Sequence, residues 1–307
     1  MNKLGKMLAA MAVVLFISAC GAGQSAPGSH DNIIIDLEGF SVALPENIET
    51  IISIGPSNTE VLVALGFGDK IIQTDIHSAD VLGISPEISN LDLMEPNLEH
   101  IVSLAPDIIF VTGIVRISGE DDPLGLVSSA GIPVIYMPSS NSIARVKEDI
   151  RFMATVLDAE AQGDRIVGEM SAEIQRIREI GQSITDRKTV YFELSPAPHL
   201  VSFGQDTFLH EMIELVGAVN IFADHESWIN VTDEVVLNLN PDVILTSVNF
   251  IDDPVGEVMS RAGWDSIAAV QNARVYAIDA GRSNRPSHNI VYALREIAEA
   301  IYPEKYI

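Results

Sequence analysis

The sequence predicts an α/β protein with two similar lobes, each built on a mostly parallel sheet, and a cleft between them. Three observations predict this fold class. One supersecondary phrase occurs twice, predicted strands alternate with predicted helices, and one long helical stretch has no counterpart in the repeat. The predicted organisation is a leader at 1–19, a tether at 20–32, a first lobe at 33–141, a connecting helix at 142–182 and a second lobe at 183–307.

The repeated phrase is a glutamate, a Pro-Asp pair at a fixed distance after it, and then an apolar run. Glu99 precedes Pro106-Asp107, and Glu234 precedes Pro241-Asp242 at the same distance. Each copy predicts a short capped helix, a turn and a buried strand. A duplicated unit of this kind indicates two similar lobes, and two lobes imply a cleft between them.

The first residues have the features of an export signal. Lys3 and Lys6 form a basic region, and residues 7–17 form an apolar stretch too short to span a bilayer comfortably. Small residues follow, directly before Cys20, the single cysteine of the chain. A lone cysteine can be a small buried hydrophobe, but this placement favours a bacterial lipobox with Cys20 lipidated. Residues 20–32, rich in Gly, Ser, Ala and Pro, predict a flexible tether.

The composition is strongly acidic. With 18 Lys and Arg against 43 Asp and Glu, the formal net charge is −25. Such a surface repels nucleic acid and anionic lipid headgroups, which argues against DNA or RNA binding. It is equally consistent with a basic partner, with solubility after export or with a salty habitat. No second apolar run approaches transmembrane length, so the lipid on Cys20 is the expected anchor.

The first lobe is predicted to begin with a hairpin and to continue as alternating strands and helices. Gly55-Pro56 turns the chain into a helix, and Gly66 closes it. Strands that alternate with helices indicate a parallel sheet covered on both faces. The expected elements are a hairpin at 33–44, strands at 51–54, 70–73, 108–112 and 133–137, and helices at 56–65 and 122–130.

The connector is predicted from apolar residues at helical spacing between residues 142 and 182. Gly163 interrupts this pattern and marks a kink or a break. The second lobe then resumes the alternation of strands and helices. Its expected elements are strands at 189–193 and 275–278, helices at 208–215 and 290–301, and the second Pro-Asp unit between them.

Several phrases occur in an order that resembles one protein family. They are the lipobox, the segment 51–60, the two Glu-to-Pro-Asp units, the segment 263–270 and the closing Ile301-Tyr-Pro303. Together they resemble the extracytoplasmic binding proteins of iron-siderophore, haem and cobalamin ABC transporters, from about residue 33 to residue 303. The resemblance implies two Rossmann-like lobes joined by one long rigid helix, with the ligand held in a shallow cleft that closes only modestly.

Glu99 and Glu234 have a local explanation and a functional one. Asn97 and Thr232 are predicted N-caps, and a glutamate in the first helical turn complements the helix dipole. The resemblance implies in addition that these two glutamates, one on each lobe, dock onto arginines of the membrane permease. Charge pairs of this kind set register and association rate. Both explanations can hold together.

The first helix carries a similar ambiguity. Ser57 and Glu60 have the Ser-x-x-Glu spacing of a capping box, which is a sufficient structural explanation. Alternatively, Ser57 and Asn58 lie at a helix N-terminus after a strand, where they face the cleft and donate hydrogen bonds to an anionic ligand. The sequence does not rank these alternatives.

Three arginines stand out in so acidic a chain. Arg116, Arg282 and Arg285 each follow a predicted strand, at the edge where open parallel sheets bind ligands. Guanidinium groups suit carboxylates, catecholates and propionates, although a lone arginine is often a surface residue paired with an acid. Aromatic side chains that either stack on a ligand or belong to the second core are Tyr191, Trp228 and Phe203.

Met94 and His77 raise the question of haem. Methionine is usually a core filler and a lone histidine is usually structural. Some haem-binding members of the family place an axial methionine shortly before the docking glutamate, and Met94 matches that spacing. A histidine of the second lobe, His225 or His288, would complete the axial pair.

The function that fits these features is a lipid-anchored substrate-binding component of an ABC importer. It would work outside the cytoplasm, on the cell membrane, with no intrinsic cofactor, and deliver an iron chelate, haem or cobalamin to a permease dimer that has a cytoplasmic ATPase. A receptor for free zinc or manganese is the alternative, but the seven histidines show no motif spacing. An exported enzyme fits less well, because the chain has no Gly-x-Ser-x-Gly elbow, catalytic cysteine or phosphate loop.

Overall fold

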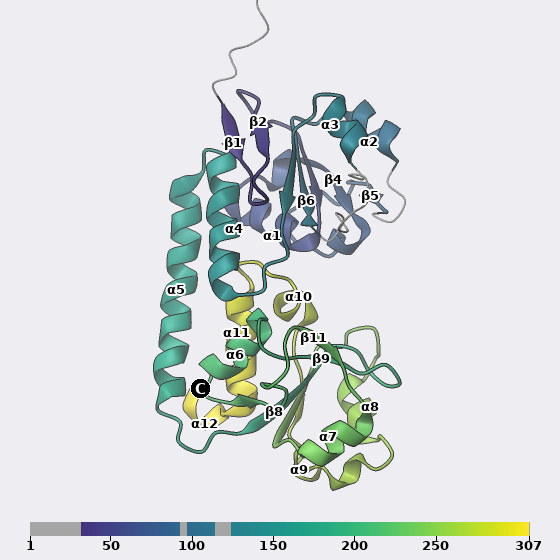
Figure 1. Cartoon of the computed structure of the whole chain (residues 1–307), viewed down its shortest axis with the longest axis vertical. Helices are drawn as coiled ribbons and strands as arrows, with labels where there is room; N and C mark the ends of the chain where they lie inside the picture. Colours follow the sequence, from purple (N-terminus) through teal and green to yellow (C-terminus); the bar gives the residue numbers. More distant parts are fainter. Residues whose placement is uncertain (1–31, 93–96, 114–123, 307) are drawn as a thin grey trace, which may run out of the picture. The chain divides into compact units, whose positions relative to one another are not determined.

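The computed structural model describes residues 32–92, 97–113 and 124–306. The predicted leader, Cys20 and most of the tether lie outside the described residues. Within the part of the chain that is described, no helix combines the length and the apolarity needed to cross a bilayer. The predicted α/β class with parallel sheets is confirmed (Figure 1).

The first lobe contains a parallel five-stranded sheet, with the strand order β5-β4-β3-β6-β7. Its strands are apolar and largely buried, as expected for a sheet covered on both faces. The strands are β3 (Ile51–Ile54), β4 (Ile71–Asp75), β5 (Asn90–Leu91), β6 (Ile108–Thr112) and β7 (Val134–Met137). The predicted hairpin forms separately, as the antiparallel pair β1 (Ile33–Ile35) and β2 (Ser41–Ala43).

Helices connect these strands. After β3, Gly55 has φ +108, and an added Cβ would lie 3.0 Å from Thr112 Cβ, so the sharp entry into the first helix requires glycine. Gly66, in the left-handed region, ends that helix as the sequence predicts. The helices of this lobe are α1 (Pro56–Leu65), α2 (Leu98–Leu104) and α3 (Gly125–Ser129), with single 3-10 turns η1 (Gly68–Lys70) and η2 (Ile76–Ser78).

The second lobe has a four-stranded parallel sheet, with the order β10-β8-β12-β13, and a separate antiparallel pair β9–β11 that the sequence does not predict. The strands are β8 (Thr189–Glu193), β9 (Val201–Phe203), β10 (Val219–Asn220), β11 (Trp228–Asn230), β12 (Val243–Thr246) and β13 (Val275–Ala277). The helices are α6 (Phe208–Leu215), α7 (Asp233–Leu239), α8 (Pro254–Met259), α9 (Ala268–Gln271), α10 (Ala280–Ser283), α11 (Ile290–Ile301) and α12 (Pro303–Tyr306).

The connector consists of two helices, so the prediction of one long helix is wrong. The helices α4 (Ile143–Val156) and α5 (Glu160–Gln182) lie side by side (Figure 1). The chain turns at Asp158, which has φ +53. Gly163 neither kinks nor breaks the helix. It lies inside α5, where an added Cβ would come 2.5 Å from Ala154 Cβ, so glycine permits the close packing of α5 on α4.

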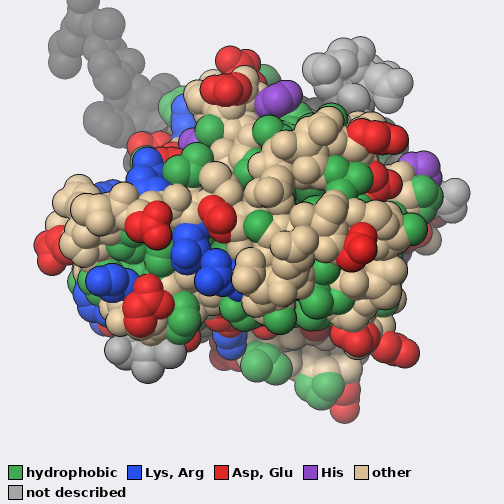
Figure 2. Space-filling view, turned by 90° about the horizontal axis from the view of Figure 1, so that it is seen from below, with side chains coloured by type: hydrophobic (Ala, Val, Ile, Leu, Met, Phe, Trp, Pro, Cys, Tyr) green, Lys and Arg blue, Asp and Glu red, His purple; other side chains and the backbone are tan. Residues whose placement is uncertain are grey.

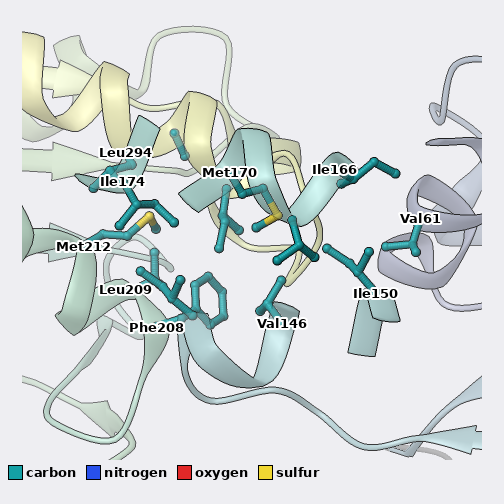
Figure 3. Close-up of a cluster of buried hydrophobic side chains, with 14 of the residues drawn as sticks. Val61, Val146, Ile150, Ile166, Met170, Ile174, Phe208, Leu209, Met212 and Leu294 are labelled. Carbon is teal, nitrogen blue, oxygen red and sulfur yellow. The ribbon is translucent and has the colours of Figure 1, made fainter. Parts of the chain in front are cut away.

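One hydrophobic core runs through the connector and joins both lobes (Figure 3). Val61 of α1 reaches it from the first lobe, and Leu294 of α11 reaches it from the second. Burying each such side chain contributes about 1.5–3 kcal/mol. The connector is therefore part of the core of each lobe. The side chains that α4, α5 and α6 add to the view are Val146, Ile150, Ile166, Met170, Ile174, Phe208, Leu209 and Met212.

The two copies of the repeated phrase form the same local structure. In the first copy, Asp107 Oδ2 accepts hydrogen bonds from Thr50 N at 2.8 Å and Thr50 Oγ1 at 2.9 Å. In the second, Asp242 Oδ2 accepts from Thr189 N and Thr189 Oγ1, both at 2.9 Å. Each aspartate lies before the second strand of a pair, β6 or β12, and each threonine lies at the start of the first strand, β3 or β8. These contacts brace the amino ends of the two central strands in each lobe.

Candidate functional site

The two lobes meet where segments that follow the carboxyl ends of their strands contact each other. Glu60 lies in α1, directly after β3, and Asp80 lies just after β4 and η2. Arg285 lies in the second lobe, after β13 and α10, and it contacts both carboxylates. Ligands of open parallel sheets bind outside the carboxyl ends of the strands. The junction is therefore the place at which this fold presents a binding site.

The contacts at this junction form a polar cluster that we call the lobe latch, made by Glu60, Asp80, Arg285, Ser287 and Asn289. The buried Glu60 carboxylate accepts hydrogen bonds from Arg285 Nη1 at 3.1 Å, from Asn289 Nδ2 at 2.9 Å and from the Ser287 hydroxyl. Arg285 Nη2 also donates to Asp80 Oδ1 at 2.7 Å and Oδ2 at 2.9 Å. The latch thus links the lobes by charge-assisted hydrogen bonds, which are the stronger kind.

The lobe latch rules out the predicted capping box of Ser57 and Glu60. Helix α1 begins at Pro56, its N-cap is Gly55, and no side chain caps it. Ser57 therefore lies inside the first turn, two positions after the N-cap, and Glu60 points to the second lobe. Asn58 is buried, and its Nδ2 donates to Ile54 O at 3.0 Å, so that amide is already bound to the backbone.

A cavity of about 440 Å³ lies beside the lobe latch and is lined by residues of both lobes. The first lobe contributes α1 and the segment after η2, and the second contributes α10 and α11. Glu60, Asp80, Arg285 and Asn289 belong to both the latch and the lining. A cavity of this size with a few convergent polar groups has the character of a small-molecule site.

His288 lies in this lining with an unused nitrogen. Its Nδ1 is buried and has no hydrogen-bond partner among the described residues. Burial lowers the pKa of His288, with the charge of Glu60 opposing the change. The imidazole is therefore neutral at neutral pH and can donate or accept one hydrogen bond with a bound molecule. Its predicted role as an axial ligand of haem stays a prediction.

Arg282 and Arg285 both line the cavity, and both already have acidic partners. Arg285 is bound in the lobe latch, whereas Arg282 pairs with Glu296 and lies 3.8 Å from Asp279 Oδ2. The Arg282 guanidinium also stacks over the Tyr292 ring, 5.6 Å from its centroid. Both arginines thus line the cavity and are also paired with carboxylates, so features of both alternatives occur together, and their contact with a ligand stays a prediction.

The predicted residues His77, His225 and Trp228 are absent from the cavity lining. His77 is exposed but lies next to the lobe latch: its backbone N–H donates to Asp75 Oδ1 at 2.8 Å, and its carbonyl oxygen accepts from Arg285 Nη2 at 3.3 Å. His225 is also exposed. Trp228 of β11 is half-exposed, with its ring edge-on to Phe203 at 6.3 Å between centroids. Met94 and Arg116 lie outside the described residues.

Two of the predicted aromatic contacts are core residues: Tyr191 belongs to a core of the second lobe, and Phe203 belongs to the core shared through the connector. Phe203 and Tyr191 are both fully buried, so neither is available to stack on a ligand. Tyr191 packs edge-on against Phe222 and Trp264, with 6.1 Å between ring centroids in each case. The correction follows from strand geometry, because Tyr191 lies on a central strand whose two faces are both covered.

Sequence reasoning missed a buried ion pair between Glu193 and Arg261. Arg261 donates from Nη1 and Nη2 to the two carboxylate oxygens of Glu193, at 2.6 and 2.9 Å. Burial raises the pKa of Glu193, and the Arg261 guanidinium opposes this shift. Arg261 also lies 4.4 Å from the ring centroid of Trp264, whose Nε1 donates to Asp233 Oδ1. The scarcity of basic residues in this acidic chain is the one sequence signal that draws attention to Arg261.

Glu99 and Glu234 are exposed in the first turns of α2 and α7. The predicted cap at Asn97 is confirmed, since its side chain accepts from His100 N at 2.9 Å. Thr232 is the N-cap residue of α7, as predicted, but its side chain makes no capping hydrogen bond to the helix backbone. Hydrogen bonds from the Glu234 backbone N–H and from the Thr232 hydroxyl instead lower the pKa of the Glu234 carboxyl.

No group of three or more His, Cys, Asp or Glu side chains converges as a metal site within the described ranges. The carboxylates of the lobe latch are bound instead by hydrogen-bond donors of the protein, such as Arg285 and Asn289. What the site offers is a polar cavity at the junction of two lobes.

The chain is similar to binding proteins of ABC transporters. A family model described as periplasmic binding protein matches residues 51–281. The ABC transporter substrate-binding lipoprotein YvrC of Bacillus subtilis is 31% identical over 89% of this chain and 86% of its own length. A vitamin B12-binding protein of Vibrio cholerae is 28% identical over 83% of this chain and 90% of its own length. The structure of a possible iron-binding periplasmic protein of Staphylococcus epidermidis matches with 27% identity and a TM-score of 0.73, over 84% of this chain and 100% of that one.

Proposed function

We propose, from the premise that this chain belongs to the periplasmic binding protein family and is a substrate-binding component of an ABC transporter, that it captures a ferric siderophore, haem or cobalamin. The single observation that carries the proposal is the cavity lined by both lobes after the carboxyl ends of their strands. Ligand binding at such a junction buries the ligand between two surfaces, and no chemical step is required of the protein.

The anchor is proposed to be a lipid on Cys20. The position of Cys20 after an apolar stretch supports it, and so does the name of the YvrC relative, which is called a lipoprotein. The protein would then stay at the outer surface of the cell membrane, next to its permease and the associated ATPase.

Docking on the permease is assigned to Glu99 and Glu234. Both are exposed, both lie in a first helical turn, and they occupy equivalent positions of the repeated unit in the two lobes. Paired charges of this kind direct the orientation and rate of association. Two equivalent carboxylates match a permease dimer, which presents two equivalent surfaces.

The test is the double variant Glu99→Gln/Glu234→Gln, assayed for ligand uptake by cells and for binding of ligand by the purified protein. We expect uptake at limiting protein to fall by about tenfold or more, because exposed interfacial charges mainly set the association rate. Ligand affinity should not change.

The matched control is Glu160→Gln/Glu304→Gln, which removes the same charge from the first turns of α5 and α12. It should leave uptake unchanged. Normal uptake by the Glu99/Glu234 variant, with ligand binding intact, would disprove the docking role.

A further inference from the structure

Positive charge is distributed unevenly over this molecule. Of its 18 basic residues, six lie in α4 and α5. Figure 2 shows acidic side chains across the viewed face and basic ones gathered on the left, the side on which Figure 1 places α5. The six residues are Arg145, Lys147, Arg151, Arg165, Arg176 and Arg178.

The cavity itself has more acidic than basic groups. Among the described residues, its lining contains three carboxylates, Glu60, Asp80 and Asp279, and two guanidinium groups, Arg282 and Arg285. Both guanidinium groups are bound to carboxylates, Arg285 within the lobe latch and Arg282 by Glu296. The part of the lining formed by described residues therefore has a negative balance, and its two cations are already paired with carboxylates.

We infer that the ligand of this cavity carries no net negative charge and is a neutral or cationic chelate or corrinoid. An anionic ligand would have to draw Arg285 away from Glu60 and Asp80 or remain unpaired beside them. The first alternative breaks bonds that join the two lobes, and the second leaves like charges close together in a partly desolvated site. A neutral or cationic ligand meets neither obstacle.

The state of His288 is a second observation that favours a neutral or cationic ligand. Its neutral imidazole lies in the lining with Nδ1 buried and without a partner among the described residues. One hydrogen bond from a neutral ring suits an amide, a hydroxamate or a similar uncharged polar group. Polyanions are instead held by several cations or backbone N–H groups together.

This inference rests on the proposed function, and one experiment separates the two. The full chain, purified in detergent, is titrated calorimetrically with neutral cyanocobalamin, with cationic ferrioxamine B and with two anionic probes, ferric enterobactin and haem. We expect a neutral or cationic probe to bind at least about tenfold more tightly than either anionic probe, since each tenfold step is about 1.4 kcal/mol. Equal or tighter binding of an anionic probe would overturn the inference and leave the proposed function standing. Binding of no probe would overturn the proposed function, and the inference with it.

The variant Asp80→Asn tests whether the local charge is responsible. Asn retains a side-chain oxygen for Arg285 but removes one negative charge from the rim of the cavity. It should shift the ratio of cationic to anionic affinity by about threefold toward the anion at low salt. Asp164→Asn, an equal change of charge on exposed α5, should not. Equal shifts in the two variants would assign the selectivity to the charge of the whole chain and refute the local explanation.

Discussion

At the scale of single residues, Asp149 of α4 shows how surroundings set a charge. Burial raises the pKa of its carboxyl from 3.8 to about 6, although the Ser140 hydroxyl donates a hydrogen bond that opposes the shift. The unfolded chain therefore loses this proton more readily than the folded protein does. The stabilising contribution of protonated Asp149 is complete below pH 3.8 and is lost as the pH rises through about 6.

Asp149→Asn should therefore stabilise the protein at neutral pH. We expect the free energy of unfolding in urea at pH 7 to rise by about 1–2 kcal/mol, because the variant has no buried charge to solvate. The gain should shrink as the pH falls from about 6 toward 3.8. Asp164→Asn, on an exposed part of α5, should change the free energy of unfolding by less than about 0.5 kcal/mol, both at pH 7 and at the lower pH values. A gain that does not depend on pH would contradict the assignment.

Single residues are also where sequence reasoning reached its limit. The Ser57-x-x-Glu60 spacing predicts a local capping box, yet the partner of Glu60 is Arg285, 225 positions away. Arg261 likewise forms hydrogen bonds with Glu193, which lies 68 positions away in the chain. A spacing motif reports neighbours along the chain, whereas a buried carboxylate is bound by whichever donor the fold brings to it.

At the scale of elements, the repeated Glu-to-Pro-Asp unit was predictable because its signals are local. An apolar run such as Ile108–Thr112, bounded by a Pro-Asp turn, specifies a buried strand by itself. A short strand whose partner lies far along the chain carries no such signal. Strands β9 and β11 have three residues each, pair with α6 and β10 between them in the chain, and were missed, whereas the equally short β1 and β2 are neighbours along the chain and were predicted.

The threonine braces of the repeated unit should contribute equally in the two lobes. Thr50→Val and Thr189→Val each remove the hydroxyl that bonds to Asp107 or Asp242 while keeping the shape of the side chain. Each should lower the free energy of unfolding by about 1–2 kcal/mol in urea titrations, and the double variant should show the sum, because distant sites act independently. Thr155→Val on the exposed face of α4 is the control and should be nearly neutral. A large cost in one lobe and none in the other would show that the two braces are not equivalent.

At the scale of the whole molecule, the connector explains how two lobes behave as one body. Two-lobed architecture could be read from the repeat, but a connector made of two helices could not, because the turn at Asp158 has neither Gly nor Pro. The two connector helices contribute to one shared core (Figure 3). Helix α5 packs against α6 and α11 of the second lobe, and α4 packs against α1 of the first lobe. The lobe latch adds a second link at the cavity.

The two lobes should therefore unfold together. In urea, amide protection of β3 and β6 in the first lobe and of β8 and β12 in the second should be lost at one denaturant concentration, measured by hydrogen exchange with mass spectrometry. Met170→Ala should lower that concentration equally for all four strands. Met170 is 2% exposed on α5, and such a truncation costs about 2–5 kcal/mol wherever the cavity cannot collapse. Glu169→Ala, on the exposed side of the same helix, should leave it unchanged within about 0.5 kcal/mol. Loss of protection in one lobe at lower urea than in the other would show that the shared core does not couple them, and a ligand held between such lobes would then meet a hinge rather than a rigid frame.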